Sequence, residues 1–323
     1  WNPGPRQEAD PAFGLPATER TIAERLREIG YATGAVGKWH LGYAADRVPT
    51  ARGFDAFYGF LGEAMAYTRE GRGPQHLVRG TDAAPMATHT TEAFADEAVD
   101  FIEANRQGPF FLYVAFNAMH APLQATDPYL SRFADESDVR RRTYLAMLSA
   151  MDDAVGRIVD AVDHAGVGER TLIVFTSDNG APTWQTTGSN APLNGIKATF
   201  LEGGIRVPTI FRWTGEVPAG RTIRALGIGQ DIAVTALEAA NADPEATLDG
   251  IDLLPVLSGD RHAPRRPLFW RAGPHGAMRE GDWKLMRMND DWYLFDLRRD
   301  PGERHNLAAR HPRRLARMRA RWE

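Results

Sequence analysis

Hydrophobic and polar positions change along the chain in a way that predicts helices and strands in turn. A capping-box spacing that begins at Thr21, with Gly30 as the closing glycine, predicts a first helix over Thr18–Ile29. Two runs, Pro109–Phe116 and Thr171–Ser177, are apolar on both faces, as buried parallel strands are. The other predicted elements are strands at Ala32–Gly37 and Val207–Arg212 and helices at Thr91–Asn105, Val139–Ala165 and Asp231–Ala240. This alternation predicts an α/β fold with a mostly parallel sheet flanked by helices.

The pattern changes after Arg261. Short Trp- and Leu-rich runs alternate there with Gly, Asn and Asp, which predicts a small antiparallel sheet. These runs are Pro267–Arg271, Trp283–Met288 and Trp292–Asp296. A closing amphipathic helix is expected to place Leu315, Met318 and Trp322 on one face. We therefore expect an α/β domain at 1–261 and a C-terminal subdomain at 262–323.

Composition is that of an ordinary globular protein, with 43% hydrophobic and 25% charged residues in a chain of 323. The net charge of −4 argues against nucleic-acid binding, and the arginines of the closing helix are interpreted as a solvated face rather than a nucleic-acid patch. No apolar run reaches the roughly 18 residues that a membrane span needs. Cysteine is absent, which excludes a disulfide, a zinc-thiolate site or a cysteine nucleophile within these residues.

Only three of the 38 basic residues are lysines, namely Lys38, Lys197 and Lys284. In a chain that otherwise uses arginine, a retained lysine indicates a place that needs a compact ammonium group, unless its position is due to chance. Lys284 is expected to be an exposed strand residue. Glu202 and Arg206, four positions apart near Lys197, are expected to be structural partners rather than catalytic groups.

Polar side chains follow three of the predicted strands. Lys38 and His40 follow the first, His120 follows the run that ends at Phe116, and Asp178 with Asn179 follows the run that ends at Ser177. Ligands of open α/β sheets bind at the carboxyl ends of the strands. We therefore expect these side chains to surround one pocket.

Each of these groups has a chemical and a plain structural interpretation. Asp178 and Asn179 offer hard oxygen ligands for Ca²⁺ or Mg²⁺, although they are too few alone and also form a good turn sequence. Lys38 and His40 would point to the same side of an extended chain and could bind an anionic ester. Such a pair also occurs on protein surfaces without a functional role. His120 could equally be a loop histidine bonded to the backbone.

Five motifs then occur in an order typical of one enzyme family. They are Gly37–Gly42 (GKWHLG), Pro49–Asp55 (PTARGFD), His120–Pro122 (HAP), Ser177–Gly180 (SDNG), and Gly195–Lys197 (GIK) with Glu202–Pro208 (EGGIRVP). Two later stretches, Arg279–Leu285 and Leu294–Leu307, are similar to the C-terminal subdomain of the same family. On these residues the chain resembles the sulfatases, and within them the arylsulfatase branch with its N-acetylgalactosamine-4-sulfatase-like members.

The resemblance implies an alkaline-phosphatase-like fold and hydrolysis of sulfate monoesters. It implies that Asp178 and Asn179 bind Ca²⁺ (or Mg²⁺), and that Lys38 holds sulfate oxygens together with two further cationic side chains. Those two are His120 and Lys197, either of which would also protonate the leaving alcohol. His40 would orient the nucleophile, which in this family is a formylglycine made from Cys or Ser in a Cys/Ser-x-Pro-x-Arg motif.

That motif is absent from the 323 residues, and so is the Asp-Asp pair that ends the first strand of the family. Since Trp1-Asn2-Pro3-Gly4-Pro5 reads as a loop rather than a start, we expect the chain to be the downstream portion of a sulfatase. We expect it to bind Ca²⁺ weakly and to be inactive alone. A periplasmic or secreted location is expected from the family only.

Two alternatives remain open from the residues. The first is a phosphate or phosphonate ester hydrolase of the same superfamily, and the second is a non-catalytic binding protein that retains the fold. The substrate is expected to be a small-molecule or saccharide sulfate ester, recognised by loops such as 62–85 and 184–192. Tyr67 and Trp184 are candidates for stacking on a sugar or aryl ring, or for simple packing.

Overall fold

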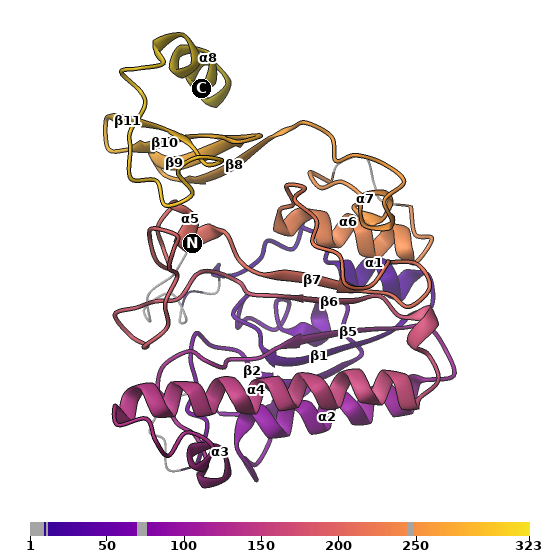
Figure 1. Cartoon of the computed structure of the whole chain (residues 1–323). Helices are drawn as coiled ribbons and strands as arrows, with labels where there is room; N and C mark the ends of the chain where they lie inside the picture. Colours follow the sequence, from indigo (N-terminus) through magenta and orange to yellow (C-terminus); the bar gives the residue numbers. More distant parts are fainter. Residues whose placement is uncertain (1–9, 11, 70–75, 244–247) are drawn as a thin grey trace.

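The computed structural model describes residues 10, 12–69, 76–243 and 248–323 (Figure 1). The loop expected at Trp1–Pro5 lies outside these residues, as do positions 70–75 of the loop 62–85. No helix in the described ranges is both long and apolar enough to cross a bilayer.

The central sheet has the strand order β4-β3-β2-β1-β5. Its parallel part consists of β1 (Ala32–Lys38), β2 (Ala56–Phe60) and β5 (Phe110–Ala115), with β1 in the middle. The short strands β3 (Val78–Arg79) and β4 (Asp82–Ala83) extend it in antiparallel fashion. This arrangement confirms the predicted α/β fold with a mostly parallel sheet.

Helices cover both faces of this sheet (Figure 1). On one face Phe111 packs with Leu26 of α1 (Ile22–Glu28) and Leu237 of α6 (Gly229–Ala239). On the other face Leu112 packs with Ile102 of α2 (Thr90–Asn105) and with residues of α4 (Val139–His164). Because neighbouring strand residues point to opposite faces, one apolar run serves both cores, as predicted. The short helices are α3 (Asp127–Ser131), α5 (Glu202–Ile205) and α7 (Leu254–Ser258), with 3-10 turns at Pro49–Ala51 and Gly168–Arg170.

The first helix begins later than predicted. The Thr21 side chain accepts the backbone N–H of Glu24 at 3.0 Å, and the Glu24 carboxylate accepts the N–H of Thr21 at 2.6 Å. This capping box places Thr21 at the N-cap, so that residues before it lie outside the helix. Gly30 has a φ of 91°, in agreement with its predicted role at the C-terminal end.

The second apolar run behaves differently from the prediction of a parallel strand. It forms β6 (Ile173–Thr176), which pairs with β7 (Thr209–Arg212) in a separate two-stranded antiparallel sheet. Within the described residues, β5 pairs only with β1 and β6 only with β7. An apolar run indicates a buried strand but does not show whether its neighbour runs parallel or antiparallel. The prediction of a parallel strand was wrong for this reason. Both strands pack on the same helices, since Phe110 and Ile173 belong to one cluster with α4.

The C-terminal region forms a four-stranded antiparallel sheet in the order β11-β10-β9-β8. Its strands are β8 (Pro267–Ala272), β9 (His275–Glu280), β10 (Trp283–Met288) and β11 (Asp291–Asp296). The closing helix α8 (Pro312–Trp322) packs Met318 and Trp322 against it, as predicted, whereas β9 was not predicted. Arg314 lies over the Trp283 ring at 4.0 Å, so part of the basic face of α8 stacks on the sheet.

Lys284 of β10 is fully buried, and the expectation that it is exposed was wrong. Its ammonium group lies 2.9 Å from a carboxylate oxygen of Glu202 and 2.8 Å from one of Glu303. Glu202 also lies 3.9 Å from Arg206, in line with the structural pairing expected for these two. Strand alternation alone did not reveal that two carboxylates from distant segments enclose the lysine.

Candidate functional site

The ends of β1, β2 and β5 lie side by side, and glycine makes this close approach feasible. A Cβ on Gly37 would meet the carbonyl oxygen of Ala115 at 2.1 Å, and one on Gly59 would meet the oxygen of Gly37 at 1.9 Å. Beyond the strands, the N–H of Trp39 donates to the carbonyl of Phe60 at 3.0 Å. The chain therefore leaves β1 in a direction set by its neighbours.

Four of the predicted residues meet at this edge. Burial lowers the pKa of Lys38, and the charge of Lys197 lowers it further, while Asp178 and Glu63 act in the opposite direction. Burial also lowers the pKa of His120, again with contributions from Lys197 and Lys38. Each of these effects requires the two groups to lie near one another. The last residue of β1 and two loop residues thus form one cationic cluster with acidic neighbours.

Glu63 is a member of this cluster that the sequence analysis missed. It follows the end of β2 (Ala56–Phe60), a strand that was not predicted. It acts electrostatically on both Lys38 and His120. The pattern that located the other residues, a polar side chain after a strand end, applies to Glu63 as well.

A buried tyrosine forms hydrogen bonds with the turn that carries His120. The hydroxyl of Tyr67 lies 2.5 Å from the carbonyl oxygen of Asn117 and 2.9 Å from that of His120. His120 Nδ1 lies 2.8 Å from the carbonyl oxygen of Ala121, which can only accept, so Nδ1 carries a proton. Because Tyr67 is fully buried it cannot stack on a ligand, whereas Trp184 is 54% exposed.

His40 is not an extension of strand β1. The strand ends at Lys38, and His40 has a φ of 54°, in the left-handed region. Its N–H donates to the carbonyl of Leu61 at 3.0 Å, and its ring lies 6.1 Å from the ring of Phe13. The extended backbone predicted for Lys38 to His40 is therefore not observed, and strand alternation does not describe how these two side chains are placed.

Asp178 and Asn179 lie in the turn after β6. The hydroxyl of Ser177 donates to the carbonyl of Asn179 at 3.0 Å, and the side chain of Asp178 is exposed. Partial desolvation raises the pKa of Tyr113 in β5, although this side chain is 46% exposed, and the charge of Asp178 raises it further. The turn after β6 therefore lies near β5.

The side-chain oxygens of these two residues are of the type that binds Ca²⁺ or Mg²⁺, but two ligands do not make a complete site. Carboxylate and amide oxygens are the donors that both ions prefer, and Ca²⁺ takes about six to eight of them. Across the described parts of the chain, no group of three or more His, Asp or Glu side chains is arranged to hold a metal. Further ligands would have to come from substrate, water or other residues.

Lys197 lies in a loop with dense backbone contacts. Gly195, two residues earlier, has a φ of 91°, and its carbonyl accepts a hydrogen bond from the Asn190 side chain at 3.1 Å. The hydroxyl of Thr199 accepts the N–H of Ile196 at 3.1 Å. The half-buried Lys197 is thus carried by an ordered turn.

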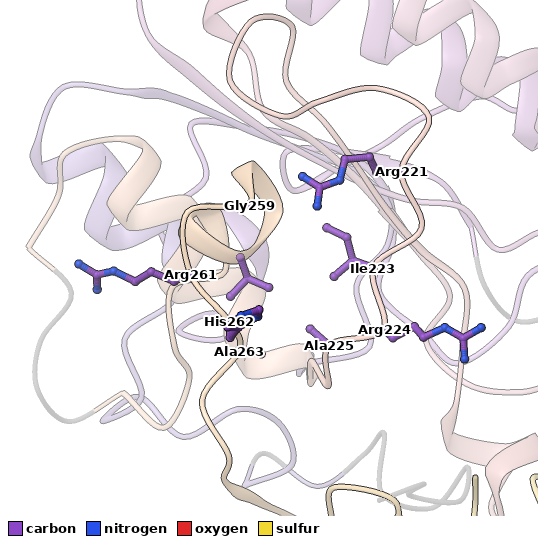
Figure 2. A pocket seen from close by; sticks show the side chains of 9 residues that line it. Arg221, Ile223, Arg224, Ala225, Gly259, Arg261, His262 and Ala263 are labelled. Carbon is purple, nitrogen blue, oxygen red and sulfur yellow. The ribbon is translucent and has the colours of Figure 1, made fainter. Parts of the chain in front are cut away.

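A separate pocket of about 390 Å³ lies near α7. It is lined by Arg221, Ile223, Arg224, Ala225, Val256, Gly259, Arg261, His262 and Ala263. Figure 2 shows that Arg224 and Arg261 point away from it in opposite directions. None of the predicted site residues lines this pocket, and its cationic groups do not converge on one point.

Comparison with known proteins matches most of the chain to one family. The family model described as Sulfatase matches residues 4–242, and the model described as N-sulphoglucosamine sulphohydrolase, C-terminal, matches residues 197–319. The N-acetylgalactosamine-6-sulfatase of Canis lupus familiaris is 31% identical over 91% of this chain and 65% of its own length. Arylsulfatase G of Mus musculus is 36% identical over 82% of this chain and 59% of its own length. The chain therefore spans about three fifths of the length of these curated relatives.

A solved structure shows the same fold over almost the whole chain. The crystal structure of Ps i-CgsB in complex with k-i-k-neocarrahexaose superposes with a TM-score of 0.89 at 32% identity. The superposition covers 96% of this chain and 75% of that one. The structure of PsFucS1 sulfatase from Pseudoalteromonas sp. reaches a TM-score of 0.78 at 26% identity, with 93% of this chain and 71% of that one covered.

Proposed function

Because this chain belongs to the sulfatase family, we propose that it serves the hydrolysis of sulfate monoesters. The observation that carries the proposal is the cluster of Lys38, His120 and Lys197, whose charges act on one another at the strand ends. Three such groups from separate segments of the chain repel one another when protonated, and an anion between them reduces that repulsion. Sulfate ester oxygens provide this negative charge.

In the proposed site Lys38 and Lys197 hold the sulfate oxygens. His120 faces the leaving alcohol with Nε2, since its Nδ1–H donates to the carbonyl of Ala121. Burial lowers the pKa of His120, so its imidazolium form is a stronger acid than an exposed histidine. Either His120 or Lys197 then gives a proton to the departing oxygen. His40, which follows Lys38 in a constrained backbone, orients the nucleophile.

Asp178 and Asn179 are proposed as ligands of Ca²⁺ or Mg²⁺. A divalent ion there would neutralise negative charge on the sulfate oxygens. The two side chains supply oxygen donors at an exposed turn, near Lys38. Since two ligands are few, we expect this chain to bind Ca²⁺ weakly in the absence of other donors.

The nucleophile of the proposed reaction lies outside these 323 residues. They contain no cysteine and no Ser-x-Pro-x-Arg sequence, from which a formylglycine would be made. Within the described residues β5 and β6 each pair with one strand, so each has an edge whose backbone groups a further strand could bond. We therefore expect the isolated chain to bind sulfate without hydrolysing its esters.

A saccharide sulfate is the proposed substrate class. Relatives of this chain include an N-acetylgalactosamine-6-sulfatase and a protein solved with a neocarrahexaose, both at just over 30% identity. The exposed Trp184 ring supplies an apolar face of the kind that sugars stack on.

We also retain the proposed division into domains at residue 261, because β8–β11 and α8 have a sheet and an apolar cluster of their own.

Turnover of an aryl sulfate and an aryl phosphate tests the proposal. Both are measured with this chain and with the product of its complete gene, and inorganic sulfate binding is measured by calorimetry. Sulfate binding by the chain, together with aryl sulfate turnover by the complete product alone, is the expected result. Preference for the phosphate would instead favour a phosphate or phosphonate ester hydrolase. Binding of sulfate without turnover by either protein would favour a non-catalytic binding protein.

A further inference from the structure

A buried ion-pair cluster joins the α/β domain to the C-terminal sheet. Glu202, the first residue of α5, is 1% exposed and Lys284 of β10 is 0% exposed. Their charged atoms are 2.9 Å apart, and Glu303 lies 2.8 Å from the same ammonium group. Arg279 of β9 donates to the other oxygen of Glu202 at 3.0 Å. We name these four residues the α5 anchor.

The stability of the α5 anchor depends on each of its four residues. Charges removed from water are costly unless they are paired, and removing one partner leaves the others buried and uncompensated. Glu303 also accepts the backbone N–H of Glu202 at 2.6 Å, so it fixes the start of α5 through the main chain as well. Lys284 is enclosed on all sides, which fits a compact ammonium group between two carboxylates.

From this anchor, α5 reaches the two loops that carry the proposed site. The N–H of Gly203 donates to the carbonyl of Asn194 at 2.6 Å, in the loop of Lys197. The N–H of Gly180, directly after Asn179, donates to the carbonyl of Gly204 at 3.0 Å. Figure 1 shows α5 between the C-terminal sheet and strands β6 and β7.

The contacts of α5 with the turn after β6 and with the loop of Lys197 are too close to admit a side chain. A Cβ on Gly180 would lie 1.7 Å from the carbonyl oxygen of Gly203, and one on Gly204 would lie 2.4 Å from that of Thr199. Backbone therefore packs directly on backbone at both loops. A shift of α5 must move the turn of Asp178 and the loop of Lys197 together.

We propose that Lys284 is a positioning residue, which holds Asp178, Asn179 and Lys197 in place through Glu202 and α5. It acts from the C-terminal subdomain and touches neither substrate nor metal. The inference rests on the proposed function only in its assumption that these loops bind sulfate and a metal ion. The mechanical link itself, from Lys284 through Glu202 to the Gly180 amide, stands on the contacts above.

Hydrogen exchange of the Gly180 amide, followed by NMR on the whole chain, tests the link directly. In Lys284→Met this amide is expected to exchange about tenfold faster or more, because its bond to Gly204 opens without global unfolding. Calorimetry with inorganic sulfate is the second readout, with an expected loss of about tenfold in affinity. Glu202→Gln is expected to show both effects, and the double variant little more than either single one, because the two residues act as one pair.

Asp231→Asn is the matched control. Asp231 is a fully buried carboxylate of α6 that pairs with Arg266, outside the α5 anchor. It is expected to lower the unfolding temperature while the Gly180 amide and sulfate affinity remain as in the unaltered chain. If Lys284→Met does not fold, Glu303→Gln retains the pair of Lys284 with Glu202 and is measured instead, with a smaller increase in exchange expected.

Unchanged exchange at Gly180 in the folded Lys284 and Glu202 variants would overturn the proposal. The same holds if Asp231→Asn increases this exchange as much as they do, since the effect would then follow stability alone. Should the unaltered chain bind no sulfate, the proposed function fails, and the Gly180 exchange still decides whether Lys284 positions the loop.

Discussion

Lys197 lies close enough to Lys38 to lower its pKa, although one residue ends a strand of the central sheet and the other lies in a loop far along the chain. Burial has the larger effect on Lys38, and the like charge adds to it. Two ammonium groups near one another repel, and an anion between them reduces that repulsion, as the nearby carboxylates of Asp178 and Glu63 already do in part. We therefore propose this pair as part of an anion site that the fold arranges before a ligand binds.

Replacement of Lys197 tests this relationship. In Lys197→Met the pKa of Lys38 is expected to rise, because one cause of its depression is removed, and sulfate affinity is expected to fall about tenfold. The chain has only three lysines, so carbon-13 labelling of lysine yields a spectrum in which Lys38 can be titrated directly. Arg106→Met, which removes an exposed charge at the end of α2, should alter neither value. An unchanged titration of Lys38 would refute the electrostatic link.

Two glycines should respond in opposite directions to the same substitution. Gly180→Ala places a methyl group against the carbonyl of Gly203, and we expect a loss of about 2 kcal/mol or more in unfolding free energy, with weaker sulfate binding. Gly156→Ala, on the exposed side of α4 with nothing within 4 Å, should increase stability by about 0.5–1 kcal/mol. Urea titration measures both. Equal effects at the two positions would contradict the tight contact at Gly180.

Stability should fall as the pH decreases below neutrality. Burial lowers the pKa of His89 from its ordinary value of 6.5, and Nδ1 accepts the N–H of Thr91 at 3.3 Å, which requires an unprotonated nitrogen. Below pH 6.5 the unfolded chain therefore binds a proton that the folded chain resists, so the unfolding free energy decreases as the pH falls. His120 is shifted in the same direction and adds to the slope.

Urea unfolding at a series of pH values from about 7 to about 5, a range that includes the ordinary histidine pKa, checks this dependence. His89→Asn retains a side-chain acceptor at the N-cap of α2 and should flatten the slope in part. Its slope cannot vanish, because His120 remains. A variant slope as steep as that of the unaltered chain would contradict the assignment to His89.

The buried hydroxyl of Tyr67 should stabilise the turn of His120. Tyr67→Phe removes the only proton that this side chain offers to the carbonyls of Asn117 and His120, so we expect a loss of about 1–2 kcal/mol in unfolding free energy. Sulfate affinity should fall as well, because the turn loosens. Tyr58→Phe, in strand β2, serves as the matched control for loss of a tyrosine hydroxyl, because it is the Tyr67 hydroxyl that bonds these carbonyls. Sulfate affinity equal in the two variants would show that Tyr67 does not support the turn.

Local patterns in the sequence were sufficient for most elements of the fold. The capping box at Thr21, the long helix that ends near Gly166 and the apolar run at Phe110–Phe116 appear in the structure close to where they were predicted. Each depends on the spacing of neighbouring residues, which periodicity reports. The short strand β2 has weaker alternation and was missed, and Glu63 was missed with it.

The sequence by itself determined that Lys38, His120 and Asp178 lie at or after the ends of strands, and from this it predicted that they lie close together. Only the tertiary structure decided that Lys284 is buried between Glu202 and Glu303, and that β6 pairs with β7 instead of extending the parallel sheet. The physical reason is one of range. Strand and helix patterns arise from neighbours a few positions apart, whereas a buried charge is stable only beside partners that the fold brings from distant segments.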